Sequence, residues 1–272
     1  GQDVPNDPLV GEEESKDLRS PDQEPMRARV TGFVQRALPG ATPEQGCAWI
    51  DRGGAESAAR FWTLDPIDGT KGFLRGDQYA VALALVVDGQ VQLGVLGCPN
   101  LTDAYLPDLN GPGSLVVGVR GQGAWTTSLV EPGPFTQLHA SQVQDPTKLR
   151  VLRSFEAGHT DAGLVDTFSL SLGIESQPVR MDSQAKYAVL AAGGGELILR
   201  LLSPEKPDYR EKIWDQAAGS IIVEEAGGRI SDLNGQKLDF AQGRTLKNNR
   251  GVLASNGHLH AIAKQTLKEL GA

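Results

Sequence analysis

The sequence predicts an α+β protein with an antiparallel sheet in its first half and a smaller, mixed α/β second half. The first observation is a series of short apolar segments separated by turn signals between residues 61 and 125, which is the pattern of a β-meander. The second is a change of rhythm after residue 140, where strand patterns alternate with helix patterns, as in α/β folds. We therefore expect an α+β domain over residues 1–140 and an α/β domain over residues 141–272.

The composition is that of an ordinary globular protein and makes several classes of protein implausible. The net charge of −8 disfavours a non-specific nucleic-acid surface. Two cysteines, Cys47 and Cys98, are too few for a disulfide framework and fit a reducing compartment; Cys98 lies in an apolar run and is expected to be a buried thiol. No apolar run approaches the roughly 20 residues that span a bilayer. We expect a cytoplasmic protein without a targeting segment, bound to neither membrane nor nucleic acid polymer.

The first sixty residues contain one short strand pattern and one clear helix pattern. The apolar pair at 9–10 precedes three glutamates, and either a short strand or a solvated acidic loop fits it. Over residues 26–38 the apolar positions are close to helical spacing, and Pro39 ends the pattern. Residues 42–60 give no clear pattern apart from the loop signal of the glycine pair at 53–54.

The meander follows from residue 61. A continuous apolar run over 79–87 is followed by Asp88 and Gly89, a strong hairpin signal, and the chain returns over 91–96. Further strands are predicted over 103–106, 114–119 and 123–125.

The second half alternates strand and helix patterns. Strands are predicted over 149–153, 196–202, 229–231 and 251–254, and helices over 161–172, 183–192, 213–226 and 258–270. The helix over 213–226 is expected to be amphipathic and to end at Gly227.

Two aspartates and a glycine turn mark the stretch from which the site prediction starts. Pro66 lies between Asp65 and Asp68; it fixes φ and removes a donor, so both carboxylates can point to one side. Carboxylate oxygens bind hard cations such as Mg²⁺. The amides of Gly69 and Thr70, at a predicted helix start, would suit a phosphate. From these residues alone, a proline turn with an aspartate N-cap is the more common explanation of the pattern.

Two carboxylates make a poor Mg²⁺ site, so further ligands must come from elsewhere in the chain. The acidic turn at Glu12 and Glu13 is one source. The other is Asp215, which follows the apolar anchor Trp214 and is otherwise explained as an N-cap or a first-turn acid.

Polar residues on the helix predicted from residue 183 are candidates for substrate binding. Ser183 and Lys186 are three residues apart and share a helix face, and Asp182 is the expected N-cap. Lys186 suits a phosphate, although a solvated helical lysine fits the same pattern. The histidines have no metal-site spacing, which argues against a zinc enzyme; we expect His139, His258 and His260 on the surface and His159 in a loop.

Five motifs occur in the order of the inositol-monophosphatase-like, metal-dependent phosphatase superfamily, and they resemble its 3′(2′),5′-bisphosphate nucleotidase branch. They are GEE (11–13), DPIDGTKGFLRGDQYAVALALV (65–86), GVLGCPN (94–100), DSQAKY (182–187) and EKIWDQAAG (211–219). The similarity runs from about Asp7 to the C-terminus. The resemblance implies a layered α/β/α/β/α sandwich of the inositol monophosphatase and fructose-1,6-bisphosphatase type, with a metal-binding first domain and a nucleotide-binding second domain.

The resemblance also implies a ligand set for two or three Mg²⁺ ions. One ion would be bound by Glu12, Asp65 and the carbonyl of Ile67. A second would be bound by Asp65, Asp68 and Asp215, with Asp65 bridging the two. Paired metals stabilise both the attacking and the leaving oxygen of an in-line displacement.

Roles on the substrate side follow from the same resemblance. The amides of Gly69 and Thr70 would bind the phosphate, and the Thr70 hydroxyl would orient the attacking water. The implied nucleotide contacts are Glu156, His159, Asp182, Ser183 and Lys186.

The implied function is that of a lithium-sensitive, magnesium-dependent hydrolase, a monomeric phosphatase of sulfur metabolism. It would remove the 3′-phosphate of adenosine 3′,5′-bisphosphate (PAP), with 3′-phosphoadenosine 5′-phosphosulfate as a second candidate substrate. One alternative is an inositol polyphosphate 1-phosphatase. Another is a nucleotide-binding protein disabled in catalysis, because the helical segment that begins the family, and that supplies an acid beside Thr70, has no counterpart in this sequence. Gln216 stands where the branch commonly has histidine.

Overall fold

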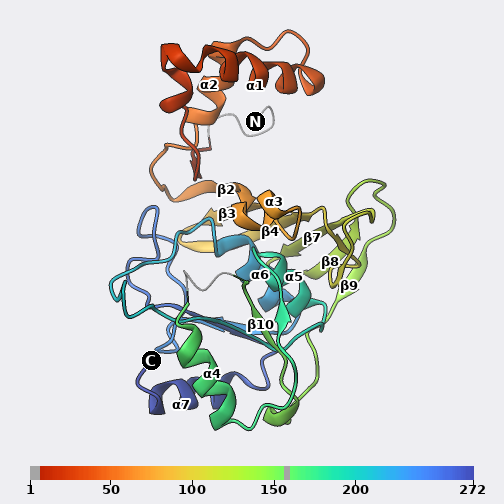
Figure 1. Ribbon diagram of the computed structural model, residues 1–272, viewed down its shortest axis with the longest axis vertical. Coiled ribbons are helices and arrows are strands. Elements are labelled where there is room, and N and C mark those ends of the chain that lie inside the picture. The colour runs from red at the N-terminus through yellow and green to blue at the C-terminus, as the bar shows by residue number, and fades with distance from the viewer. Residues whose placement is uncertain (1–6, 156–159) are drawn as a thin grey trace.

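The computed structural model describes residues 7–155 and 160–272 as two large sheets with helices in alternating layers (Figure 1), together with one two-stranded sheet. The layers from one end of the molecule to the other are the helices α1 (Glu24–Ala37) and α2 (Pro43–Asp51), a seven-stranded sheet, the helices α5 (Ala185–Ala191) and α6 (Ala217–Glu225), a five-stranded sheet, and the helices α4 (Ala162–Ser171) and α7 (His260–Glu269). The predicted α+β class and layer order are confirmed. The division at residue 140 stays a prediction.

The seven-stranded sheet contains the predicted meander. Its strands, in spatial order, are β1 (Leu9–Gly11), β2 (Arg60–Asp68), β3 (Ala80–Val87), β4 (Gln90–Cys98), β7 (Ser114–Val119), β8 (Gly123–Ser128) and β9 (Thr136–Leu138). Only β1 and β2 are parallel among these neighbours. At the β3–β4 turn both Asp88 and Gly89 have positive φ, 49° and 73°, as a type I′ hairpin requires.

The predicted strand over 103–106 is wrong. Asp103 and Ala104 have φ values of 53° and 63° and form a turn between the short strands β5 (Leu101–Thr102) and β6 (Leu106–Pro107). The buried hydroxyl of Ser114 accepts the Ala104 N–H at 2.8 Å and donates to the Leu101 carbonyl at 2.7 Å. A distant side chain therefore satisfies backbone groups that a strand ladder would otherwise pair.

The second sheet is mixed, as predicted. Its spatial order is β11 (Val179–Arg180), β10 (Val151–Arg153), β12 (Leu197–Arg200), β14 (Val252–Ser255) and β13 (Arg229–Ser231). The pairs that include β10 are parallel, and the pairs that include β14 are antiparallel. Along β12, Ile198 packs in the core shared with the first sheet, whereas Leu197 and Leu199 pack with residues of α4 and α7.

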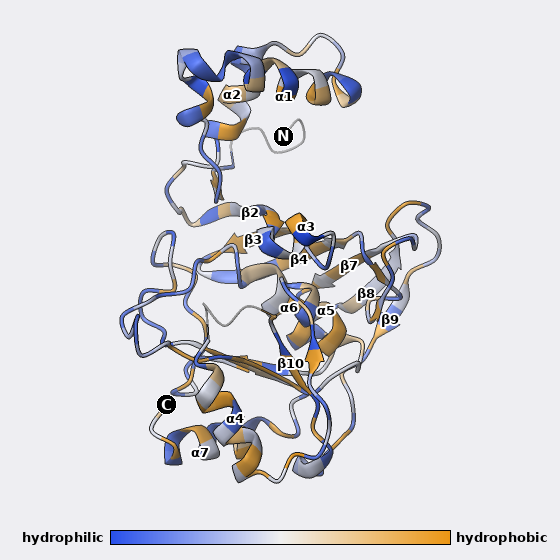
Figure 2. Ribbon diagram, in the orientation of Figure 1, coloured by the Kyte–Doolittle hydropathy of each residue, from blue (hydrophilic) through white to orange (hydrophobic). Residues whose placement is uncertain are grey.

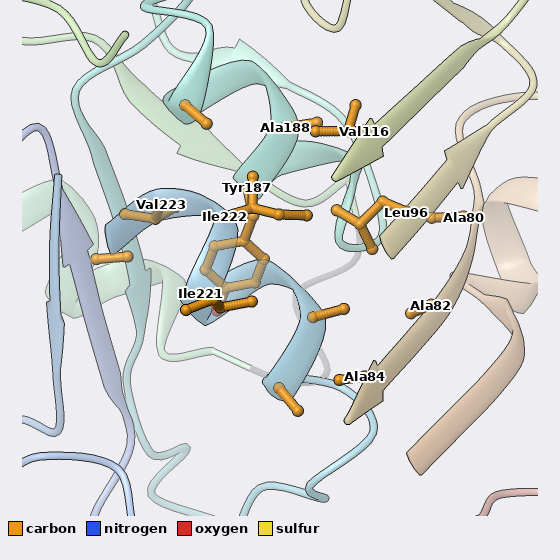
Figure 3. Packing of buried hydrophobic residues seen from close by; sticks show 14 of the residues in the cluster. Ala80, Ala82, Ala84, Leu96, Val116, Tyr187, Ala188, Ile221, Ile222 and Val223 are labelled. Carbon is orange, nitrogen blue, oxygen red and sulfur yellow. The ribbon is translucent and has the colours of Figure 1, made fainter. Parts of the chain in front are cut away.

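Helices α5 and α6 are buried between the two sheets, and Figure 3 shows Tyr187 and Ile221 in this interior. Residues 217–223 of α6 are all buried, so the prediction of an amphipathic helix is wrong, and the helix begins four residues later than expected. Glycines in the sheet allow this close packing. A Cβ on Gly94 would lie 2.4 Å from Cγ2 of Ile221, and one on Gly118 would lie 2.9 Å from Cα of Ile222.

Helices α1 and α2 belong to an arm, residues 12–52, that leaves the seven-stranded sheet after β1 and returns before β2 (Figure 1). Helix α1 confirms the prediction over 26–38. Helix α2 was not predicted, yet it begins with a capping box: Oγ1 of Thr42 accepts the Gln45 N–H at 3.2 Å, and Oε1 of Gln45 accepts the Thr42 N–H at 2.9 Å. Figure 2 shows polar and apolar residues alternating along both helices. The arm leaves several large apolar side chains exposed, among them Phe33 and Trp49.

None of the helices in residues 7–155 and 160–272 combines the length and apolar character that crossing a membrane requires.

Candidate active site

The end of β2 places Asp65 and Asp68 on the same face of the sheet. Asp65 pairs with Ala82 and Asp68 pairs with Ala80, so an advance of three residues along β2 matches an advance of two residues along β3. This extra residue is a β-bulge, and it returns the second aspartate to the face of the first. Oδ1 of Asp65 accepts the Ile67 N–H at 3.0 Å, which holds the turn around Pro66.

Three of the predicted acids converge. Carboxylate oxygens of Asp65, Asp68 and Asp215 all lie within 4.8 Å of one another. Asp215 comes from the turn that precedes α6, more than a hundred residues after the other two. Glu12 lines the same pocket beside them, although much of the residue is exposed. The structure thus brings the remote acids to the β2 turn from both halves of the chain.

The pKa of each of these acids is raised, in the first place by burial. Burial, with the neighbouring charges of Asp68, Glu12 and Asp215, raises the pKa of Asp65 to about 9. Burial also raises the pKa values of Asp68 and Asp215, and it raises that of Glu12, where a hydrogen bond with Asp65 opposes the rise. A bound cation stabilises the charged forms, so this all-oxygen donor set fits a hard divalent metal ion.

The acids line a pocket of about 220 Å³. Its walls come from the segment 65–72, from the segment 182–187 at the start of α5, and from the end of β12. The backbone N–H of Gln184 donates to Oδ2 of Asp68, and the Gln184 amide group donates to the Trp214 carbonyl at 2.8 Å and accepts the Gly219 N–H at 3.0 Å. Gln184 therefore links Asp68 to the turn that contains Asp215.

Asp182 is not the N-cap that the sequence predicts. Ser183 has φ 66°, α5 begins at Ala185, and the residue at the N-cap position is Gln184. The carboxylate of Asp182 instead accepts the Phe155 N–H at 3.1 Å and forms an ion pair with Arg75. Ser183, with its left-handed backbone conformation, separates Asp182 from the N-cap residue Gln184 and turns Asp182 away from the helix axis. Asp182 and Ser183 both line the pocket.

Lys186 lines the pocket and is buried, so its interpretation as a solvated lysine is wrong. Its Nζ donates to Oγ of Ser154 at 2.9 Å and to the Met181 carbonyl at 3.4 Å. Burial, together with the positive charge of Arg200, lowers the pKa of Lys186 to about 8.

The remaining predicted residues lie at the pocket entrance or outside the described part of the chain. Thr70 is exposed at the start of α3 (Thr70–Arg75), and its hydroxyl donates to the Ile67 carbonyl at 3.3 Å. Gly69 is the N-cap of that helix, with φ 86°. Glu156 and His159 lie outside the described residues.

The prediction that His260 lies on the surface is wrong, because the residue is buried. Its Nε2 and Nδ1 each lie 3.0 Å from a serine hydroxyl, those of Ser231 and Ser255. His139 and His258 are exposed, as predicted.

Sequence reasoning missed a buried polar network behind the pocket. Arg200 lines the pocket at the end of β12 and donates to Glu211 at 2.8 and 3.2 Å. Glu211 also accepts the Gln216 amide at 2.7 Å, and the Tyr187 hydroxyl donates to the Gln216 oxygen. The available signal was an arginine inside the apolar strand pattern predicted over 196–202, a position where a charge needs a partner or a ligand.

The chain is similar to known proteins both in sequence and in fold. The inositol monophosphatase family matches residues 2–271. A 3′(2′),5′-bisphosphate nucleotidase of Schizosaccharomyces pombe is 45% identical over 268 residues, which cover 92% of this chain and 74% of that protein. A 3′(2′),5′-bisphosphate nucleotidase of Oryza sativa is 42% identical, with 92% and 73% covered. Among solved structures, Thermotoga maritima IMPase matches with a TM-score of 0.59 at 21% identity, over 96% of this chain and 89% of that one. This match shows a similarity of fold.

Proposed function

This chain belongs to the inositol monophosphatase family, within its 3′(2′),5′-bisphosphate nucleotidase branch, and we propose that it removes the 3′-phosphate of adenosine 3′,5′-bisphosphate. In this hydrolysis water attacks the phosphorus, the bond to the ribose 3′-oxygen breaks, and that oxygen takes up a proton. The 3′-phosphate of 3′-phosphoadenosine 5′-phosphosulfate is the second candidate substrate group.

The observation that carries the proposal is the combination of charges in one pocket. Asp65, Asp68 and Asp215 supply a converging set of carboxylates, and Lys186 and Arg200 supply two cations that line the same space. Carboxylates repel a phosphate unless metal ions lie between them. Buried cations, in contrast, bind a phosphate directly. A ligand with two phosphate groups satisfies both halves of the pocket.

We propose Mg²⁺ as the metal, in two or three ions, because the donor set consists of oxygens. Glu12, Asp65, Asp68 and Asp215, with the carbonyl of Ile67, would hold it. When bound, such ions stabilise charge on the phosphate oxygens and lower the pKa of bound water.

The chain's own groups would orient the reactants. The first amides of a helix have no intrahelical partners, so those of Gly69 and Thr70 are available to phosphate oxygens. The Thr70 hydroxyl, now donating to the Ile67 carbonyl, would accept or donate a hydrogen bond to the attacking water. Lys186 and Arg200 would fix the second phosphate and thereby orient the nucleotide.

The test is phosphate release from adenosine 3′,5′-bisphosphate by the wild type and by Asp68→Asn. The variant should lose Mg²⁺-dependent release by at least about 100-fold, since a metal ligand is removed. The matched control is Asp145→Asn, because Asp145 is a capping aspartate that accepts the Thr147 N–H at 3.0 Å outside the pocket. Unchanged turnover by Asp68→Asn would contradict the assignment of the metal site.

The alternatives predict other outcomes of the same assay. Faster release from inositol 1,4-bisphosphate than from the nucleotide would favour the inositol polyphosphate 1-phosphatase. Tight nucleotide binding by calorimetry without turnover would favour the disabled nucleotide-binding protein.

A further inference from the structure

Arg244 touches both segments that bring remote acids to the candidate active site. Its Nη2 donates to the Gly11 carbonyl at 2.6 Å, and its guanidinium carbon lies 4.8 Å from the centroid of the Trp214 ring. Gly11 immediately precedes Glu12, and Trp214 immediately precedes Asp215. The Arg244 side chain therefore connects the backbone next to Glu12, from the first half of the chain, with the residue next to Asp215, from the second half.

The same guanidinium also closes the base of the arm, which we call the neck, formed by Gly11 and Gly53. The Gly11 N–H donates to the Gly53 carbonyl at 2.7 Å, and a Cβ on Gly11 would lie 3.4 Å from the Gly53 Cα. Nη1 of Arg244 donates to that same Gly53 carbonyl at 3.0 Å. The arginine thus binds the outgoing and the returning chain at once, and Glu12 is the first residue beyond the neck.

Arg244 is itself anchored to the segment that leads to Asp215. The Ile213 N–H donates to the Arg244 carbonyl at 3.2 Å, and the Leu246 N–H donates to the Glu211 carbonyl at 2.8 Å. The loop around Arg244 therefore moves with residues 211–213. The guanidinium of Arg244 lies over the Trp214 ring. The Lys212 ammonium also lies over this ring, 5.7 Å from its centroid.

We propose that Arg244 is a positioning residue that holds Glu12 in place relative to Asp215 and thereby sets the affinity of the site for its metal ion. This inference rests on the proposed function of the site. A planar guanidinium donates to two carbonyls and stacks on an indole at the same time, whereas a lysine ammonium is a single point charge on a flexible stem. Without the arginine the neck keeps the Gly11–Gly53 hydrogen bond and the pairing of Val10 with Gly54. The Glu12 N–H also keeps its bond to the Leu64 carbonyl at 3.3 Å. The chain around Glu12 is then less firmly held, so its carboxylate is placed less precisely, while Asp65, Asp68 and Asp215 keep their positions.

The experiment measures metal binding and turnover separately in Arg244→Lys and Arg244→Gln. Mn²⁺ binding to the substrate-free protein is followed by calorimetry, and phosphate release is followed against Mg²⁺ concentration. Both variants should bind Mn²⁺ about tenfold more weakly and need correspondingly more Mg²⁺. Their kcat at saturating Mg²⁺ should stay within about threefold of the wild type, since Arg244 is not among the residues that line the pocket.

The control is Arg120→Lys, because Arg120 is an arginine of the same kind at the other end of α6. Arg120 donates to the Val91 carbonyl at 2.9 and 3.2 Å and to Glu224 at 2.6 Å. It therefore also binds a carbonyl with two nitrogens, but away from the acids, and its replacement should leave Mn²⁺ binding unchanged.

A double variant tests whether Arg244 acts through Glu12. Glu12→Gln alone should weaken Mn²⁺ binding, and adding Arg244→Lys should weaken it no further, because coupled residues are not additive. Independent, additive losses would overturn the proposal, as would wild-type Mn²⁺ affinity in both single arginine variants. If the wild type binds no Mn²⁺ and releases no phosphate, the proposed function fails; if only the arginine variants behave as wild type, the inference alone fails.

Discussion

Gly69 and Ser183 lie against each other across the candidate active site. A Cβ on Gly69 would lie 2.8 Å from the Cβ of Ser183, and both residues have positive φ, 86° and 66°. The contact brings the turn after Asp68 against the segment that begins α5. These two segments carry the predicted phosphate-binding and nucleotide-binding residues, so their separation fixes the width of the pocket.

Gly69→Ala should therefore destabilise the protein and impair the site. An alanine at positive φ costs about 1 kcal/mol, and the clash with Ser183 adds to it. Urea unfolding should show a loss of about 2 kcal/mol or more, together with a higher KM. The matched control is Gly76→Ala, at φ 74° with no atom within 4 Å of its Cβ, which isolates the backbone effect at about 1 kcal/mol. Equal losses in the two variants would contradict the clash.

The packing of α6 on the seven-stranded sheet predicts a contrast between two glycines of β4. A Cβ on Gly94 would lie 2.4 Å from Cγ2 of Ile221 and 2.6 Å from the Ala218 carbonyl, so Gly94→Ala should cost about 2 kcal/mol through overpacking. Gly97 points to the other face, where the nearest atom would lie 3.7 Å away. Gly97→Ala should change the free energy of unfolding by less than about 0.5 kcal/mol, and urea titration of both variants checks this.

His260 predicts a loss of stability in mild acid. The Ser231 hydroxyl donates to the Asp232 carbonyl at 2.8 Å, so it accepts from Nε2, and Nδ1 is left as an acceptor for the Ser255 hydroxyl. Burial, with the positive charges of Arg229 and Lys264, lowers the pKa of His260 to about 4. The unfolded chain thus binds a proton at a higher pH than the folded chain does.

The sign follows from linkage. The stabilising contribution of neutral His260 is complete above a pH of about 6.5 and is lost as the pH falls towards about 4, at a cost of about 3 kcal/mol. Chemical unfolding between these pH values should show a shallower dependence for His260→Gln than for the wild type. His258→Gln, at an exposed position, should follow the wild type. Parallel curves for all three proteins would rule out the buried neutral histidine.

Metal ions should stabilise the folded protein through the acid cluster. Because Asp65, Asp68 and Asp215 converge in the folded chain, a cation that they bind raises the melting temperature, and the gain grows with the logarithm of the cation concentration once this exceeds the dissociation constant. At 100 times the dissociation constant the gain is about 2.7 kcal/mol. Differential scanning fluorimetry should show this for Mg²⁺ in the wild type and lose it in Asp68→Asn. A shift that persists in the variant would place the cation elsewhere.

Local patterns in the sequence predicted the sheets and much of the site. The apolar runs and the Asp88-Gly89 turn are short-range signals, and the structure confirms the strands that they predict, apart from the one over 103–106. Pro66 indicated that Asp65 and Asp68 share a side, although the bulge that achieves this depends on pairing with β3.

Other features depend on contacts that no local pattern contains. The contacts of Arg244 with Gly11 and Gly53 join positions about two hundred residues apart in the chain. Burial of α6 on all sides is decided by the presence of two sheets around it, and its sequence alone does not distinguish this from one covered face. For His260 a signal existed, because Ala263 and Leu267 follow at helical spacing and are buried with it.

The narrow neck has a consequence for how the chain tolerates changes of length. Since Gly11 and Gly53 are in contact, everything between them begins and ends at one point, and the entropy of closing such a loop grows only slowly with its length. We therefore expect that insertions, deletions or a fused domain within the segment 15–50 leave the registers of the strands unchanged. Glu12 sets the limit of this freedom, because it lies directly beyond the neck and lines the pocket.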